Sequence, residues 1–156
     1  MPGFIRNFMT QIAALTGYTE HRPIFQNTWG DGLFFVFEKV ADGGHFALEL
    51  AECVAGMDRA AMGLPQDMAL RIALHAGPVY GFEDRIIGKK NYIGSHVNSA
   101  ARMEPQTQPG QVYASDAYVA LAVLEAPNEF RFDYVGKIPL AKDYGEYPLY
   151  HVRPAK

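Results

Sequence analysis

The sequence contains very little cysteine, no dense run of basic residues and no long apolar segment. Cys53 is the single cysteine among 156 residues, so no disulfide can form within the chain. The formal net charge is −3, which argues against nucleic acid as a partner. No apolar run is long enough to cross a bilayer, and the first residues do not resemble a signal peptide. These absences predict a cytoplasmic protein that contacts neither nucleic acid nor a membrane.

The sequence is rich in apolar residues arranged in regular patterns. Hydrophobic residues make up 49% of the chain, and its length suits one domain with a sizeable core. We therefore expect a single domain over residues 1–156. Phe4, Phe8, Ile12 and Leu15 recur at helical spacing, so this domain is expected to begin with an amphipathic helix.

Strand and helix patterns alternate after this first helix. Apolar runs over 24–29 and 33–37, separated by Gly30-Asp31-Gly32, predict a hairpin. The later elements expected are a long helix from 42–44 to 63–65, strands over 68–76, 79–82 and 92–93, a helix stopping before Pro105, a strand over 112–114, a helix capped by Ser115 and running to Leu124, and strands over 130–134 and 147–152. This order predicts an α+β fold in which helices cover a sheet.

One segment, from Asn91 to Met103, carries the most specific functional signal. It leads from a short strand into a short helix on which Asn98 and Arg102 are four residues apart, and side chains at this spacing share a face. An amide and a planar guanidinium on one face can hold a ribose and a phosphate together. The simpler alternative is a solvent-facing or capping asparagine and a surface arginine.

This segment and two others, in their order and spacing, resemble the class III nucleotide cyclase homology domain, the family of adenylate and guanylate cyclases. The matching segments are Asn27 to Leu33, Leu70 to Val79 and Asn91 to Met103, with Gly110 to Ser115 and Tyr134 to Leu140 also fitting. The resemblance implies a ferredoxin-like cyclase fold with a mixed, mostly antiparallel sheet. In this family a strand with a metal-binding aspartate precedes the first helix. That strand is missing from the pattern here, so the chain is expected to be N-terminally truncated.

The resemblance also implies a metal site. Asp31, between two glycines, matches one of two aspartates that bind Mg²⁺ or Mn²⁺, and its carboxylate is a suitable hard ligand. The alternative is that Gly-Asp-Gly is only turn chemistry. Glu20 is the one acidic residue before Asp31, and its place in a turn makes it a poor candidate for the second ligand.

Nucleotide contacts are implied in the same way. Asn98 would orient the ribose, and Arg102 would stabilise charge on the α-phosphate. Lys142 roughly matches a lysine that holds the triphosphate, although Lys137 competes with it. Arg85, Lys89 and Lys90 are the other candidate phosphate ligands, or else belong to a solvated loop.

The chain departs from the family pattern at the positions that read the purine. Asn27 and Asn91 stand where adenylate cyclases present Lys and Asp or Thr, and guanylate cyclases present Glu and Cys. Asparagine both donates and accepts, so the pair could read either purine loosely or read neither. Ser95-His96 is a second departure. His75, on an apolar strand, is predicted to be a satisfied core histidine rather than a ligand.

The leading hypothesis is a homodimeric cyclase domain that converts ATP, in preference to GTP, to a 3′,5′-cyclic nucleotide and pyrophosphate for intracellular signalling. In this family the metal aspartates of one subunit face the Asn and Arg of the other. The main alternative is a catalytically silent cyclase-like domain that dimerises or senses a nucleotide. An unrelated ferredoxin-like ligand-binding module ranks last.

Overall fold

The computed structural model describes residues 3–29, 32–66, 68–86, 88–140, 143 and 145–155. Within these residues the elements are α1 (Gly3–Tyr18), β1 (Phe25–Trp29), β2 (Gly32–Val36), α2 (Val40–Ala55), α3 (Arg59–Met62), β3 (Ile72–Leu74), β4 (Tyr80–Asp84), β5 (Lys89–Ile93), α4 (Ser95–Met103), the 3₁₀ helix η1 (Glu104–Gln106), β6 (Val112–Ser115), α5 (Asp116–Glu125), β7 (Phe130–Pro139) and β8 (Glu146–Pro154). None of the described helices is both long and apolar enough to cross a bilayer.

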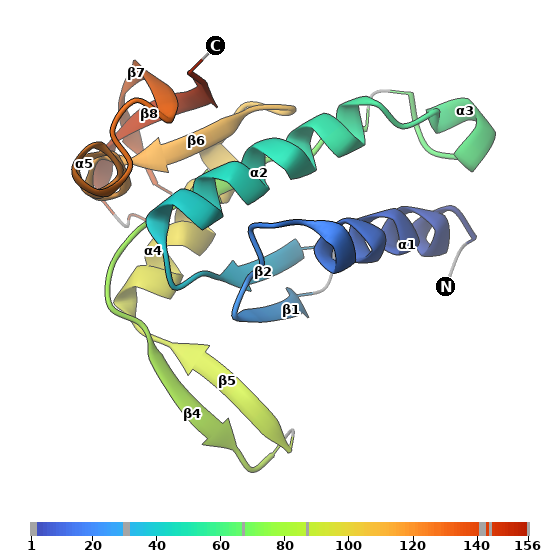
Figure 1. Ribbon diagram of the computed structural model, residues 1–156, viewed down its shortest axis with the longest axis horizontal. Helices are drawn as coiled ribbons and strands as arrows, with labels where there is room; N and C mark the ends of the chain where they lie inside the picture. The colour runs from blue at the N-terminus through green and yellow to red at the C-terminus, as the bar shows by residue number, and fades with distance from the viewer. Residues whose placement is uncertain are drawn as a thin grey trace.

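The strands form a four-stranded mixed sheet and two hairpins. The order in the larger sheet is β3-β6-β8-β7, with β3 parallel to β6 and the other pairs antiparallel. β1 pairs with β2 and β4 with β5, both antiparallel. The β4–β5 hairpin extends away from the rest of the molecule, whereas α1 and α2 run side by side (Figure 1). The predicted α+β fold with a mixed, mostly antiparallel sheet is confirmed.

Three buried apolar clusters hold these elements together. The first lies where α2 and α5 pack on the four-stranded sheet, and includes Ala47, Val112, Tyr118 and Val152. The second joins α1 to α2 and includes Phe8, Ile12, Phe46 and Leu50, with Phe35 and Ile72 packed against it. The third is formed by Met103, Tyr113, Leu140 and Leu149. Because Met103 ends α4, this third cluster fixes that helix to the sheet.

The long helix predicted to end at Gly63–Pro65 is in fact two helices. α2 begins at Val40, slightly earlier than expected, and ends at Ala55. Asp58 then caps α3 by accepting a hydrogen bond from the Ala61 N–H at 3.1 Å, and Gly63 ends α3 with φ 73°. A short acidic side chain that binds a free backbone N–H favours a new helix start over continuation. The prediction missed this competition.

One further prediction was wrong in its bounds, and another was correct. The strand expected over 68–76 is limited to Ile72–Leu74, because only these residues pair with β6. The helix cap was predicted correctly, since Ser115 Oγ accepts a hydrogen bond from the Tyr118 N–H at 3.2 Å at the start of α5.

Candidate functional site

Helix α4 presents Asn98 and Arg102 away from the core. Val97, Ser99 and Met103 are the buried residues of this helix, whereas Asn98 is exposed and Arg102 is partly exposed. Neither of these two side chains makes a hydrogen bond or ion pair with another of the residues described. The amide and the guanidinium, one helical turn apart, are therefore available to a ligand.

The start of α4 is held by side chains of the sheet. Ser99 Oγ donates to the Ser95 carbonyl oxygen at 3.1 Å and lies 3.2 Å from the Tyr147 hydroxyl on β8. His96 Nδ1 lies 2.9 Å from His75 Nε2. These contacts fix the helix that carries Asn98 and Arg102 relative to the four-stranded sheet.

His75 is a satisfied histidine, as predicted, but it is half-buried just beyond β3 rather than a core residue on the strand. Its Nδ1 lies 2.7 Å from Ser115 Oγ, so both ring nitrogens have partners. Burial is the main cause that lowers the pKa of His75; His96 lowers it further, and Asp116 acts in the opposite direction. The pairing with His96 was not predicted from the sequence. The one signal was the unusual Ser95-His96 in the nucleotide motif, and nothing in the spacing placed it beside His75.

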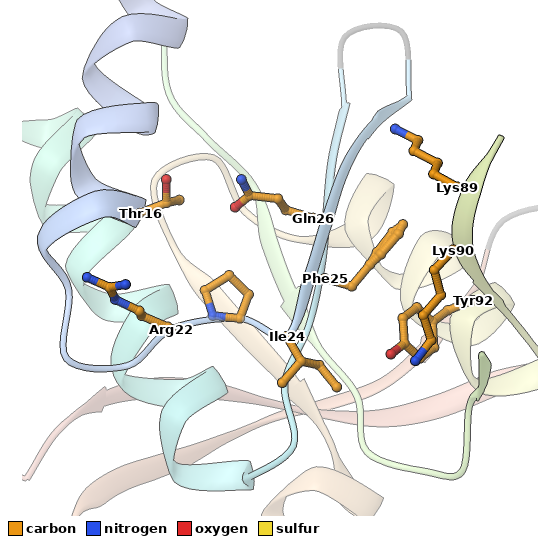
Figure 2. A pocket seen from close by; sticks show the side chains of 9 residues that line it. Thr16, Arg22, Ile24, Phe25, Gln26, Lys89, Lys90 and Tyr92 are labelled. Carbon is orange, nitrogen blue, oxygen red and sulfur yellow. The ribbon is translucent and has the colours of Figure 1, made fainter. Parts of the chain in front are cut away.

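A hollow of about 510 Å³ lies between the end of α1, the start of β1 and strand β5 (Figure 2). Its lining has three cationic side chains, an amide, two aromatic rings and no carboxylate, and consists of Thr16, Arg22, Pro23, Ile24, Phe25, Gln26, Lys89, Lys90 and Tyr92. The hollow therefore suits an anionic ligand, although the chain as a whole is acidic.

Aromatic contacts join the two strands that border this hollow. The Phe25 and Tyr92 rings meet edge to face with centroids 5.1 Å apart, and the Lys90 ammonium lies 5.2 Å from the centroid of the Tyr92 ring. Such ring and cation contacts stabilise a pair of otherwise separate hairpins. They place Lys89 and Lys90, predicted as phosphate ligands or loop charges, on a strand beside the hollow; Arg85 is not part of its lining.

The three cationic side chains around the hollow differ in their contacts. Arg22 donates to the Gly17 carbonyl oxygen at 2.8 Å, at the end of α1. Lys89 and Lys90 lie opposite Asp84 and Glu83 in the β4–β5 ladder. Both lysines line the hollow from a strand, so they are candidate cations for a phosphate there.

The two asparagines predicted to read the purine lie on the same two strands but do not line the hollow. Asn27 is on β1, where its Oδ1 accepts from the Thr28 N–H at 2.9 Å. Asn91 is on β5, where its Oδ1 accepts from the Tyr92 N–H, also at 2.9 Å. Each side chain keeps its amide N–H₂ donors for a ligand, so both positions present the same chemistry.

Two predicted site residues, Asp31 and Lys142, lie outside the described residues. Lys137, the competing phosphate lysine, is exposed on β7. In the described part of the chain, no group of three or more His, Cys, Asp or Glu side chains could hold a metal ion. Asp31 alone does not complete the coordination of a divalent cation, which would need further oxygen ligands from phosphate or water.

Comparison with known proteins identifies a family and a set of similar folds. The family described as the adenylate and guanylate cyclase catalytic domain matches residues 32–152. No curated protein matches the chain.

Three solved structures illustrate the similarity of fold. A structure of Trypanosoma brucei adenylate cyclases in their monomeric state is 19% identical, with a TM-score of 0.79 over 97% of this chain and 79% of that chain. The Catenaria anguillulae guanylate cyclase domain in complex with GTP is 20% identical, with a TM-score of 0.76 over 99% and 84%. A non-canonical dimeric guanylyl cyclase domain from Blastocladiella emersonii is 18% identical, with a TM-score of 0.71 over 97% and 82%.

Proposed function

Because the chain belongs to the adenylate and guanylate cyclase catalytic domain family, we propose that it is a nucleotide cyclase domain, converting a nucleoside triphosphate to a 3′,5′-cyclic nucleotide and pyrophosphate. The observation that carries this proposal is that Asn98 and Arg102, both on α4, make no hydrogen bond or ion pair with another of the described residues. ATP is favoured over GTP as the substrate on family grounds. Residues 1–156 are taken as one cyclase domain with a cytoplasmic location.

The proposed reaction joins the ribose 3′ oxygen to the α-phosphorus. The bond between that phosphorus and the bridging oxygen of pyrophosphate breaks, and the 3′-hydroxyl proton passes to solvent or a base. Negative charge on the α-phosphate oxygens is compensated by Arg102, whose planar fork can hold two oxygens at once. Asn98 orients the ribose through its amide. This division of roles needs both side chains on one helix face, where α4 places them.

The triphosphate and its counter-ion are assigned to other parts of the chain. Lys89 and Lys90, beside the hollow, supply positive charge, and Lys142 is the further proposed phosphate ligand. The proposed cofactor is Mg²⁺ or Mn²⁺, with Asp31 as its ligand from this chain. When bound, the ion would neutralise charge on the phosphates.

Base selection is proposed to be weak. Asn27 and Asn91 use their oxygens on backbone N–H groups and leave similar amide donors for the purine. Adenine and guanine both carry ring or carbonyl acceptors that such a donor can meet. The two nucleotides are therefore expected to bind within about tenfold of each other, a difference of at most roughly 1.4 kcal/mol.

The proposed assembly is a homodimer. By family resemblance, Asp31 of one subunit faces the Asn98 and Arg102 of the other, so that two incomplete half-sites make a complete one. Cross-linking between an introduced cysteine near Asp31 and one near Asn98 tests this arrangement. Links that form only within one chain, or not at all, would contradict it.

The function is tested by measuring nucleotide binding and product together. Calorimetry with ATP and GTP reports binding, and chromatography in the presence of Mg²⁺ or Mn²⁺ reports the cyclic nucleotide. With one metal carboxylate in the chain, binding is expected to be weak and cyclisation slow. Arg6→Ala, at an exposed position on α1, is the matched control for Arg102→Ala. Absence of nucleotide binding would refute the proposal.

The catalytically silent alternative is favoured by asparagine at both purine-reading positions. A silent domain would bind nucleotide or dimerise without forming product. Nucleotide binding with no cyclic product under either metal ion would select it over the enzyme. Robust product formation by the 156-residue chain would exclude it and would show that another group replaces the second aspartate.

A further inference from the structure

A chain of hydrogen-bonded side chains ties the start of α4 to the four-stranded sheet. Ser115 Oγ lies 2.7 Å from His75 Nδ1, and His75 Nε2 lies 2.9 Å from His96 Nδ1. The two imidazole rings are stacked, with centroids 5.0 Å apart and planes at 29°. His96 is in the first turn of α4, His75 directly follows β3, and Ser115 ends β6. The contacts therefore run from the sheet to the helix that carries Asn98 and Arg102.

The first turn of α4 has no conventional cap. Gly94, at the N-cap position, has φ 144° and provides no side-chain hydrogen bond to the helix. The His96 ring lies against Gly77, where an added side-chain carbon would overlap it. The ring thus fills space that only glycine leaves open, and it also stacks against the His75 ring. Packing and hydrogen bonding together fix the position of His96.

The contact between the two rings depends on protonation. A neutral imidazole has one N–H donor and one acceptor nitrogen, so two neutral rings can share the proton between His75 Nε2 and His96 Nδ1. A singly charged pair can keep the bond, because a protonated His75 donates to both Ser115 and His96. Once both rings are protonated, two N–H groups face each other and the charges repel. The hydrogen bond between the two rings is therefore kept in the singly protonated pair and lost in the doubly protonated pair.

The surroundings of the pair make the second proton unfavourable. Three groups from three elements face His75, namely His96 on α4, Asp116 at the start of α5, and Tyr147 on β8 with its ring centroid 6.4 Å away. Burial and the facing imidazole lower the pKa of His75, and together they outweigh the carboxylate of Asp116. Burial and the facing imidazole therefore oppose protonation of His75.

We propose that His75 and His96 are a positioning pair that, while sharing a proton, holds the first turn of α4 so that Asn98 and Arg102 face the nucleotide together. A second proton releases that turn. The proposal rests on the proposed function, because the nucleotide is the ligand that Asn98 and Arg102 are taken to hold. It adds two residues that do not touch the nucleotide and act through α4.

Three variants separate positioning from general stability. His96→Asn keeps an amide atom near the place of Nδ1 and does not titrate. His96→Leu removes the hydrogen bond altogether. His151→Asn is the control, because this histidine lies on β8, where its side chain contacts Arg153 and Tyr113.

Nucleotide affinity gives the first readout, measured with ATP by calorimetry. As the pH is lowered from about 8 to the lowest pH at which circular dichroism shows all four proteins folded, wild type and His151→Asn are expected to lose about tenfold more affinity than His96→Asn. His96→Leu should bind about tenfold more weakly than wild type already at the higher pH. Protonation of the nucleotide itself is common to all four proteins. Parallel pH profiles for wild type and His96→Asn, or wild-type affinity in His96→Leu, would overturn the proposal.

Nitrogen-15 NMR without nucleotide gives the second readout, and it separates this proposal from the proposed function. In wild type the backbone amide signals of Asn98 and Arg102 should shift with the same midpoint as the imidazole nitrogens of His75 and His96. In His96→Asn they should not shift in that range. If neither wild type nor any variant binds ATP or GTP, the proposed function fails. The amide signals still test whether the His75–His96 pair positions α4. If the amide signals of Asn98 and Arg102 do not shift over the imidazole titration, the proposed positioning pair is refuted.

Discussion

The four-stranded sheet and the β4–β5 hairpin differ sharply in how they are held. All four residues of β6 are buried, at the centre of a sheet covered by α2 and α5. Four of the five residues of β4 are exposed, and its only strand partner in the described structure is β5. A two-stranded hairpin is marginally stable by itself, whereas a packed sheet is not. The molecule thus combines a rigid framework with a weakly supported arm.

The candidate site lies across this boundary. α4 carries Asn98 and Arg102 and is anchored in the core through Val97 and Met103, so the groups proposed to hold ribose and phosphate are on the rigid side. Asn27 and Asn91, proposed to read the base, are on the two hairpins. Precise placement matters most for groups that act on the reacting phosphate. If the proposed function holds, the groups that act on the phosphate stand on the framework, and the groups that select the base stand on the two hairpins.

The largest expected effect tests the rigid side. Leu149 is fully buried in the cluster beneath α4, so Leu149→Ala should lower the free energy of unfolding by about 2–5 kcal/mol. Ile93→Ala, at a position on β5 that is 56% exposed, should change it by no more than about 0.5 kcal/mol. Urea unfolding followed by circular dichroism measures both. Equal losses would mean that the hairpin is as well packed as the sheet.

The next effect concerns the reaction itself. Arg102→Ala should lower kcat by about 10²–10³, roughly 2.7–4 kcal/mol, and raise KM far less, because its bond to the α-phosphate strengthens in the transition state. Asn91→Ala on the arm should change the ATP to GTP ratio by less than about tenfold. Steady-state kinetics with both nucleotides measures these values. A loss confined to KM in Arg102→Ala would remove its proposed role.

A smaller effect on stability is expected at Ser115, where the four-stranded sheet leads into α5. Ser115 caps α5 and also contacts His75, so Ser115→Ala should cost about 0.5–2 kcal/mol of stability. Ser95→Ala, at the hairpin side of α4, is a comparison for the loss of a serine hydroxyl near a helix start. Thermal unfolding gives both values. A Ser115→Ala protein as stable as wild type would show that the cap is replaced.

The smallest expected effect is on the acid stability of the framework. Burial, followed by the charge of His96, lowers the pKa of His75 below its ordinary value of 6.5. Below that pH the unfolded chain takes up a proton that the folded chain does not, so the free energy of unfolding falls with falling pH until the folded pKa is passed. The stabilisation is fully present above pH 6.5. His75→Gln should flatten this part of a stability profile, and an unchanged slope would contradict the assignment.

The β1–β2 hairpin and the α5 cap could be predicted from the sequence because their signals are local. Glycine-bounded apolar runs indicated the β1–β2 hairpin, and Ser115 indicated the α5 cap. The pairing of β4 with β5 was not predicted, because the charged segment 83–90 indicated a loop. The same local reasoning failed at Asp58, where two helix signals competed, and at the short strand β3, whose length depends on its partner.

By itself the sequence determined the order of most elements, the helical spacing of Asn98 and Arg102, and the family to which they belong, since all of these depend on neighbours along the chain. The tertiary structure decided which face of α4 is buried, the lysines that border the hollow with Phe25 and Tyr92, and the pairing of His75 with His96. The physical reason is that such contacts join residues far apart in the sequence. No periodicity or propensity encodes them, and packing alone brings them within hydrogen-bond distance.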